Sequence, residues 1–433
     1  MSQEIRHHVG LAVRRQGVVG RRDFLRVTSA AGLAAGSFAW TDLVSLRADE
    51  LRRRGMACIL LWMQGGPSQF ETFDPKPGHE NGGETKAIST SVPGIELAEN
   101  LPHLAGMMDK VAIVRSMTTR EGNHQRASFL LHTAHVPTAS IRYPTLGSVV
   151  AHELAVGGGE LPAFVRIGRQ FRNVGDGGLL GSVQDPFAVT DAARLPDNAQ
   201  PTTEAARYQR RLSLLERLET ADRRTDIEQE IVEHRGLYKK AARMIRSPRM
   251  ETFDIGREPE NIRGAYGEGD FGAGCLLARR LVEAGVTFVE VALGGWDTHD
   301  DNFNRTRGLT ARLDQPYAYL LEDLAQRGML DKTLVIWMGE FGRTPRINPR
   351  TGRDHYPRAF SVALAGGGVQ GGRTIGRTNE AGTEVADRPV TTEDLFCSFY
   401  HSLGIDPSKE NMSPIGRPIK IVDGGQAVSE LFG

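Results

Sequence analysis

Two short motifs in this sequence place an acid beside a histidine at spacings that suit a metal ion. In "GGWDTHDDN", Asp297 and His299 are separated by one residue, and alternate side chains of an extended chain point the same way. In "GRDHYPRAF", Asp354 and His355 are neighbours just before an apolar run. Carboxylates and imidazoles together are common ligands of zinc, manganese and iron. Either motif alone is also common in surface loops, so the surrounding elements must bring the two together.

Five apolar runs predict the strands of one sheet. Each run is short and bounded by glycine or polar residues, which is typical of strands buried on both faces. The runs are Cys58–Met63, Val111–Val114, Val286–Leu293, Thr333–Met338 and Phe360–Ala365. Helical patterns lie between them, most clearly at Phe271–Glu283 and Asp314–Gln326. Strands that alternate with helices predict an α/β fold with a mainly parallel sheet.

Residues 202–247 differ from the rest of the chain. They are rich in arginine and glutamate, contain one glycine and keep a helical apolar face up to Pro248. We expect a helical hairpin here, inserted at about 202–247 into a domain that spans 55–425.

Polar residues follow several of the predicted strands, where ligands bind in open parallel sheets. Three clusters of acids or acids with histidines occupy these positions, and a cation would hold them together. The predicted metal ligands are Asp297, His299, Glu340, Asp354 and His355. We expect a divalent metal, with zinc first and manganese or calcium as alternatives. Arg343, Arg353 and Arg373 are candidates to bind an anion at the same site through forked hydrogen bonds.

Composition and missing motifs exclude several other classes. The 53 basic residues equal the 53 acidic ones, whereas a general nucleic-acid binder has a basic excess. The three cysteines are far apart, include no CxxC pair and suit buried thiols. The run "GGGVQGG" lacks the lysine and serine or threonine of a P-loop, and no GxSxG motif is present.

The N-terminus resembles a twin-arginine export signal. In "GRRDFLRVTSAAGLAAGSFAW", Arg21 and Arg22 precede a mild apolar stretch. That stretch is shorter than the ~20 residues needed to span a bilayer, and no other segment is long and apolar enough. We therefore expect residues 1–45 to be a signal region read by the twin-arginine export machinery of a bacterium. The expected location is the periplasm or another exported compartment, without a stable membrane span.

Several longer motifs resemble the domain of unknown function 1501 family. They are "LLWMQGGPSQFETFDPKPG", "GGWDTHDDNF", "DKTLVIWMGEFGRTPRIN" and "GRDHYPRAFSVALAGGG", in that order. The resemblance covers about residues 55–425, and the family is usually placed in the alkaline phosphatase and sulfatase superfamily. It implies a three-layer α/β/α sandwich, one or two metals, and hydrolysis of phosphate or sulfate esters.

The resemblance also assigns roles to residues. "WDTH" is similar to one metal motif of the superfamily, and His355 to its late histidine ligand. Glu340 stands where an acid of an Asp-His pair is expected, with Phe341 in place of the histidine. "NHQRASFLLHTA" is similar to the nucleophile helix, and His124 or Asn123 falls near the position that normally holds serine, threonine or cysteine. As alternatives to a role at the nucleophile position, His124 could be a metal ligand or a general base.

Two departures from the superfamily pattern affect the expected chemistry. An acid normally follows the first strand, where this chain has "MQGG", and Glu71 or Asp74 are the nearest substitutes. No cysteine or serine precedes the x-Pro-x-Arg pattern that forms formylglycine, which disfavours ordinary sulfatase chemistry.

The sequence thus predicts an exported metal-dependent hydrolase of phosphate or sulfate esters on small molecules or glycans. His124 would act at the reacting centre and Arg343 would bind the anion. The alternative is a non-catalytic module that binds anionic polysaccharide or a cell-surface partner, which the missing acid and hydroxyl favour. A third possibility keeps a metal for structure only.

Overall fold

A computed structural model describes residues 55–433, apart from short gaps at 156–158, 170–173, 197–203, 205–206, 212, 215–216, 218–227 and 414–415. The chain divides into residues 1–51 and residues 52–433, and the fold described below belongs to the second unit. The predicted signal region at 1–45, and much of the predicted hairpin at 202–247, lie outside the described residues.

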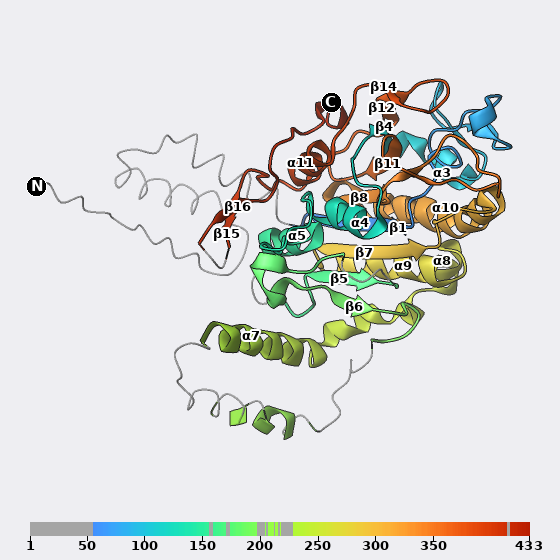
Figure 1. Cartoon of the computed structure of the whole chain (residues 1–433). Helices are drawn as coiled ribbons and strands as arrows, with labels where there is room; N and C mark the ends of the chain where they lie inside the picture. Colours follow the sequence, from blue (N-terminus) through green and yellow to red (C-terminus); the bar gives the residue numbers. More distant parts are fainter. Residues whose placement is uncertain are drawn as a thin grey trace, which may run out of the picture. The chain divides into compact units, whose positions relative to one another are not determined.

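An eight-stranded sheet forms the centre of this unit, in the order β12-β4-β11-β8-β1-β7-β5-β6 (Figure 1). Only β11 runs antiparallel to its neighbours β4 and β8, so the sheet is mainly parallel as predicted. The strands are β1 Ala57–Gln64, β4 Val111–Met117, β5 Phe164–Ile167, β6 Phe187–Val189, β7 Phe288–Gly294, β8 Thr333–Met338, β11 Phe360–Ala365 and β12 Arg373–Ile375.

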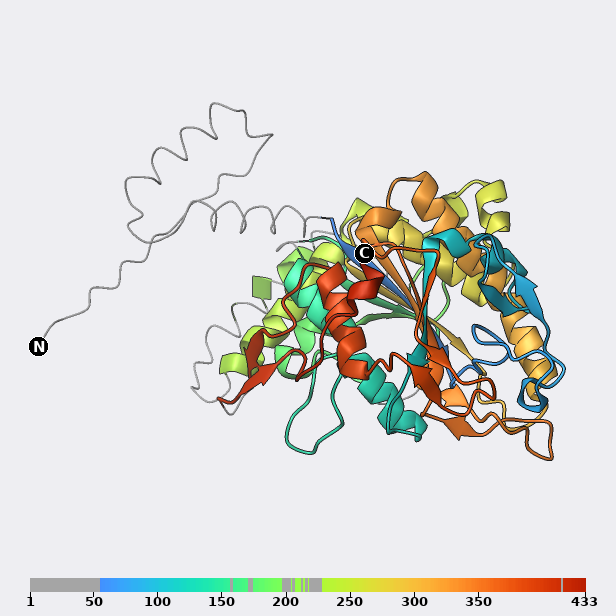
Figure 2. The ribbon, with the colours of Figure 1, turned by 90° about the horizontal axis from the view of Figure 1, so that it is seen from above.

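Helices cover both faces of the sheet (Figure 2). One face carries α3 Pro102–Gly106, α8 Glu260–Ala265, α9 Asp270–Glu283 and α10 Asn302–Gln326. The other carries α4 His124–Thr133, α5 Leu146–Leu154 and α11 Thr392–Ser402. Strand β1 joins the two cores, because Ile59 and Leu61 pack toward α9 and α10 while Leu60 and Trp62 pack toward α4 and α11. The predicted three-layer α/β/α sandwich is therefore confirmed.

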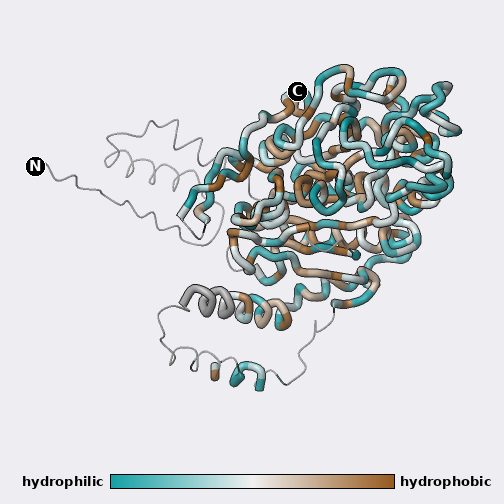
Figure 3. Tube along the Cα trace, in the orientation of Figure 1, coloured by the Kyte–Doolittle hydropathy of each residue, from teal (hydrophilic) through white to brown (hydrophobic). Residues whose placement is uncertain are grey.

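The strands form because they are continuous apolar segments, and Figure 3 shows hydrophobic chain concentrated in the sheet. Strands β8 and β11 match the prediction residue for residue, whereas β4 continues to Met117 and β7 starts at Phe288. The described part of the predicted insertion includes α7 Glu228–Ile245, which contacts the turn at Ser182–Gln184.

Small two-stranded sheets lie in the loops outside the central sheet. They pair β2 Ala87–Ser89 with β3 Glu96–Ala98, β9 Gly342–Arg343 with β10 His355–Tyr356, β13 Arg377–Thr378 with β14 Val385–Asp387, and β15 Glu410–Met412 with β16 Pro418–Lys420. All three cysteines are buried and unpaired, as predicted. Among the described residues, no helix has the length and apolarity needed to cross a membrane.

The helix predicted at Asp314–Gln326 is α10, and its start was wrong. It begins twelve residues earlier, at Asn302. Its first turns bury polar residues, Asn302, Thr306 and Thr310. The hydroxyls of Thr306 and Thr310 donate within the helix, to the side-chain oxygen of Asn302 and the carbonyl oxygen of Thr306. The first turns of α10 therefore lack the apolar periodicity that predicts a helix, although they pack on the sheet.

Candidate metal centre

The seven predicted site residues meet at one edge of the sheet. Strand β7 ends there and leads to Asp297 and His299, and β8 ends there and leads to Glu340. Because β11 is antiparallel, the residues that precede it lie at this same edge. The β9–β10 ladder then pairs His355 directly with Arg343.

One carboxylate oxygen lies at the centre of the cluster. The Oδ1 atom of Asp297 is 3.3 Å from Nε2 of His124, 3.1 Å from Nε2 of His299 and 3.3 Å from Nε2 of His355. The Nε2 atoms of His299 and His355 are 3.0 Å apart. The ligand atoms of His124, Asp297 and His355 all lie within 4.8 Å of one another, so these three residues form a group that could hold a metal ion.

Glu340 fixes the orientation of His124. Its buried carboxylate accepts a hydrogen bond from Nδ1 of His124 at 2.7 Å and another from the Gly65 backbone at 2.9 Å. A carboxylate can only accept, so Nδ1 of His124 carries the proton in this contact and Nε2 faces Asp297. Burial lowers the pKa of His124, but the hydrogen bond and charge of Glu340 outweigh it and raise the pKa.

The other two histidines are held in the same way. Nδ1 of His299 donates to Asp354 at 2.7 Å, and Nδ1 of His355 donates to the carbonyl oxygen of Gly122 at 2.8 Å. The hydrogen bond from His299 lowers the pKa of Asp354, and burial lowers the pKa of His355. In each neutral ring the lone pair then belongs to Nε2. Histidine ligands of metals usually have such a hydrogen-bond acceptor on the other ring nitrogen.

Several separations between these atoms match those between the ligand atoms of one zinc ion. Zinc binds imidazole nitrogen at about 2.0–2.1 Å, which makes ligand atoms roughly 3.3 Å apart at the corners of a tetrahedron. The three Nε2 atoms lie 3.1–3.3 Å from Oδ1 of Asp297, and those of His299 and His355 are 3.0 Å apart. Two Nε2 lone pairs this close repel each other unless a proton or a cation lies between them. The donor set therefore fits a divalent metal.

Arg343 is engaged in hydrogen bonds within the protein. Its side chain is fully buried and donates to the carbonyl oxygens of Gly66 at 2.8 Å, Arg353 at 3.1 Å and Gly65. It also donates to Asp297 at 2.6 Å. Burial raises the pKa of Asp297, but the hydrogen bond and charge of Arg343 outweigh it and bring the pKa to about 2. These donors hold Asp297 and the loop after β1, and the role of Arg343 in binding an anion stays a prediction.

Arg353 is also engaged inside the protein. Its buried guanidinium pairs with Glu71 at 2.8 Å and lies 4.4 Å from the centre of the Phe70 ring. Since both partners of this ion pair are fully buried, Glu71 does not replace the acid that the superfamily carries after its first strand. Arg353 likewise has no donor directed to a substrate at the surface.

The two remaining candidates lie elsewhere. Asp74 pairs with Lys76 at 2.9 Å. Arg373 pairs in register with Ala112, at the start of β4, and donates to the carbonyl oxygen of Glu430. The candidate centre lies at the opposite end of the strands, so Arg373 cannot contact an anion there.

Phe341 occupies the position where the resemblance expects a second histidine. Its ring lies 4.9 Å from the His124 ring and 4.6 Å from the His355 ring, measured between centroids. The ring packs beside the two imidazoles and offers no ligand atom. It supports their orientation through contact alone.

Sequence patterns identified the side chains of the cluster but missed the backbone groups that orient them. The Gly122 carbonyl and the Gly65 N–H have no residue-specific signal, since every non-proline residue has both groups. The direct contact of Glu340 with His124 was also missed, since 215 residues lie between them.

The comparisons place this architecture in a known family. The model of the family "Protein of unknown function (DUF1501)" matches residues 56–432, so the chain belongs to this family. A comparison with curated proteins gives no match.

Solved structures of similar chain course include the PsFucS1 sulfatase from Pseudoalteromonas sp., which is 12% identical with a TM-score of 0.40. That match covers 83% of this chain and 70% of the other. A protein in the alkaline phosphatase superfamily from Vibrio parahaemolyticus is 11% identical with a TM-score of 0.36, over 82% and 67% of the two chains. The phosphonate monoester hydrolase of Agrobacterium radiobacter is 12% identical with a TM-score of 0.33, over 87% and 77%. At this distance the likeness concerns the course of the chain and not its activity.

Proposed function

We propose that this protein is an exported, metal-dependent hydrolase of phosphate or sulfate esters carried by a small molecule or a glycan. The observation that carries the proposal is the cluster of three Nε2 atoms around the Asp297 carboxylate. Each imidazole has its Nδ1 atom occupied by an acceptor, so all three present Nε2 toward the Asp297 carboxylate.

The metal ligands in this proposal are His124, Asp297, His299 and His355. Three imidazoles and one carboxylate suit zinc first and manganese or iron next. Calcium, which takes six to eight oxygen ligands, fits less well. Glu340 and Asp354, which we expected to be ligands, become positioning residues because their oxygens contact Nδ1 atoms.

Each residue around such a centre would have its own role. When bound, a divalent cation stabilises negative charge on a phosphoryl or sulfuryl oxygen and makes water a stronger nucleophile at neutral pH. Arg343 keeps Asp297 ionised and fixed. Glu340 and Asp354 hold two of the three imidazoles in the tautomer that binds a cation. Phe341 fills the space beside the imidazoles.

The proposed location follows from the predicted signal region at 1–45, whose paired arginines would direct the protein to the twin-arginine export machinery. Fractionation of cells that express the full chain tests this point. Replacement of Arg21 and Arg22 by lysine should retain the protein in the cytoplasm, while normal export of that variant would contradict the proposal.

The test of the activity combines metal analysis with a substrate panel. The protein purified from its export compartment is assayed for bound metal by mass spectrometry, and for turnover of aryl phosphates, phosphodiesters and aryl sulfates with added zinc or manganese. We expect about one metal per chain and turnover of at least one ester. Asp297→Ala and His355→Ala should lose both, and His103→Ala, an exposed histidine on α3, should lose neither.

Two outcomes would change the conclusion. Activity that survives both Asp297→Ala and His355→Ala would place the reaction elsewhere. Bound metal without turnover of any ester would favour the non-catalytic alternative, a module that binds an anionic polysaccharide or a cell-surface partner.

A further inference from the structure

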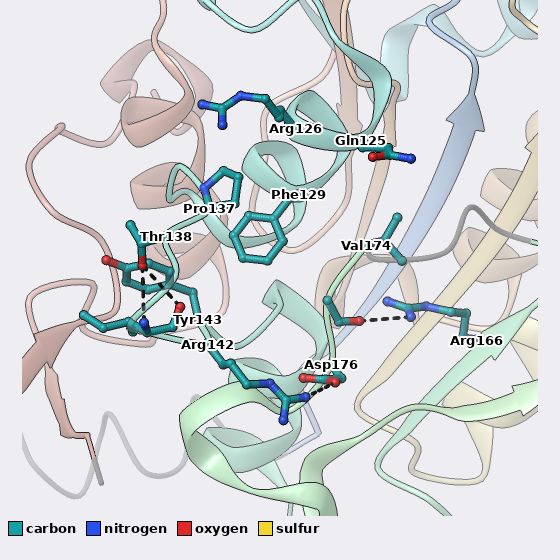
Figure 4. A pocket seen from close by; sticks show the side chains of 12 residues that line it. Gln125, Arg126, Phe129, Pro137, Thr138, Arg142, Tyr143, Arg166, Val174 and Asp176 are labelled. Atoms are coloured by element: carbon teal, nitrogen blue, oxygen red, sulfur yellow. Dashed lines mark hydrogen bonds and ion pairs between the residues drawn. The ribbon is translucent and has the colours of Figure 1, made fainter. Parts of the chain in front are cut away.

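A second feature lies along α4, the helix that begins at His124. A pocket of about 540 Å³ opens between the start of α4, the loop at 137–143 and the loop at 174–176 (Figure 4). Its volume is in the usual range for ligand pockets, roughly 300–1,000 Å³. Gln125 and Arg126 line it and directly follow His124, so the pocket begins one residue along the helix from the candidate metal ligand.

Two exposed arginines of the pocket are held in place by carboxylates. Glu121 accepts from Nε and Nη2 of Arg126 at 2.9 and 2.7 Å. Asp176 accepts from Nη2 of Arg142 at 2.6 Å, at the lower rim in Figure 4. Within the described residues these contacts leave Nη1 of Arg126, and Nε and Nη1 of Arg142, for another acceptor. The two guanidinium groups are thus oriented and still able to donate.

A third arginine lines the inner wall of the pocket. Arg166, on β5, donates to Glu290 at 2.9 Å and to the carbonyl oxygen of Gly175 at 3.4 Å. Glu290 is fully buried and also contacts Nε2 of His132 at 3.1 Å. The one carboxylate among the lining residues is that of Asp176, against three guanidinium groups. Each guanidinium has a carboxylate partner, so an anion would bind here through the remaining N–H donors and not through a net positive charge.

The other lining groups suit a ring that carries hydroxyls. Tyr143 is stacked on His135 with ring centroids 4.0 Å apart and the planes 10° from parallel, which fixes its position. Phe129 supplies a second aromatic surface, and Gln125 and Thr138 supply amide and hydroxyl groups. Saccharides combine apolar C–H faces with hydroxyls, so they match a wall of aromatic rings and polar side chains.

We propose that this pocket binds an anionic saccharide unit, with its sulfate or phosphate group on Arg126 and Arg142. Its place as an extension of the substrate site, next to the ester at the metal centre, rests on the proposed function. Binding to the pocket does not depend on catalysis and is measured separately. A nucleic acid is disfavoured as the ligand because the chain has no net positive charge.

Binding is measured by isothermal titration calorimetry of the purified protein at constant ionic strength. The probe is sucrose octasulfate, with sucrose, inorganic sulfate, inorganic phosphate and a short single-stranded oligonucleotide as separate titrants. The pocket variants are Arg126→Gln and Arg142→Gln, both at exposed side chains. The matched control is Arg312→Gln, an exposed arginine on α10, on the opposite face of the sheet.

We expect sucrose octasulfate to bind, and each pocket variant to weaken it by about tenfold through loss of a charged hydrogen bond. Arg312→Gln should stay within about twofold of the unchanged protein. His355→Ala should also bind normally, so failure of the metal centre and failure of the pocket are told apart.

Any one of several results would overturn the proposal. These are absence of octasulfate binding, equal loss of affinity in Arg312→Gln and the pocket variants, equal affinity for sucrose, and tighter binding of the oligonucleotide. Equal affinity for inorganic sulfate or phosphate would assign the pocket to a free oxyanion and remove the saccharide from it.

Discussion

Glu340→Gln is the most informative single change, because it alters a charge that touches no proposed ligand atom. The carboxylate of Glu340 is fully buried and accepts from Nδ1 of His124 and from the Gly65 backbone. Glutamine keeps the shape and one accepting oxygen but loses the negative charge. The change therefore tests whether this charge supports His124 as a ligand.

The expected loss of zinc-binding free energy follows from the hydrogen bond that is weakened. A hydrogen bond to a charged group contributes about 1.5–3 kcal/mol, and a neutral one about 0.5–1.5 kcal/mol. The variant should lose about 1–2 kcal/mol of zinc binding, which is roughly 5–30-fold in dissociation constant. Glu340→Ala should lose more, since it leaves two buried N–H groups without an acceptor.

The assay is a zinc titration of the metal-free protein against a chromophoric chelator of known affinity. Circular dichroism melts of each variant check that it is folded. Glu322→Gln, at an exposed position on α10, is the matched control and should bind zinc as tightly as the unchanged protein. A Glu340→Gln dissociation constant within twofold of the original, together with full loss of zinc in His355→Ala, would refute the assigned role of Glu340.

Three further predictions concern stability and the geometry of the site. Burial raises the pKa of Glu290, but the charge of Arg166 outweighs it and holds the pKa at about 2, against an ordinary value of 4.5. The stability from ionised Glu290 is then complete above about pH 4.5 and lost as the pH falls toward 2. This contribution is about 3 kcal/mol. In urea unfolding, the free energy of unfolding of Glu290→Gln should decline less steeply between pH 5 and 3 than that of the unchanged protein, and an equal slope would contradict this. Gly65→Ala should weaken zinc binding more than tenfold, because a Cβ there would lie 2.5 Å from the Asp297 nitrogen at a φ of +116°. Gly94→Ala, also at positive φ but in open space, should bind zinc normally, and equal loss in both would point to a general folding defect. Removal of metal by a chelator should lower the melting temperature, and readdition of excess zinc should restore it by mass action. A melting temperature that does not change with added zinc would exclude tight binding of zinc to the native state.

The sheet was predictable because its strands are buried on both faces. Strands β8 and β11 are six-residue apolar runs, and their ends coincide with the ends of the runs. The direction of β11 was not predictable, since an apolar run has the same pattern in either direction. That direction decides the site, because it places His355 at the edge where β7 and β8 end.

Helix α10 shows where periodicity fails. Asp314 resembles the start of a helix in the sequence, but its carboxylate accepts from the backbone of His103 and Leu104. It therefore caps the start of α3, a different helix, while lying in the middle of its own. A capping residue can serve a neighbour in space, and sequence patterns do not distinguish the two cases.

The net charge of the cluster favours the binding of a cation. The cluster contains three carboxylates, those of Asp297, Glu340 and Asp354, and one guanidinium, that of Arg343. Two negative charges are therefore uncompensated if the imidazoles are neutral. Glu340 is fully buried, so a positive partner is needed close by. A proton on His124 supplies part of that charge, in agreement with its raised pKa. A divalent cation held by these residues would supply all of it in place of that proton. Metal and proton would then compete for the same nitrogen, and metal affinity should fall as the pH falls.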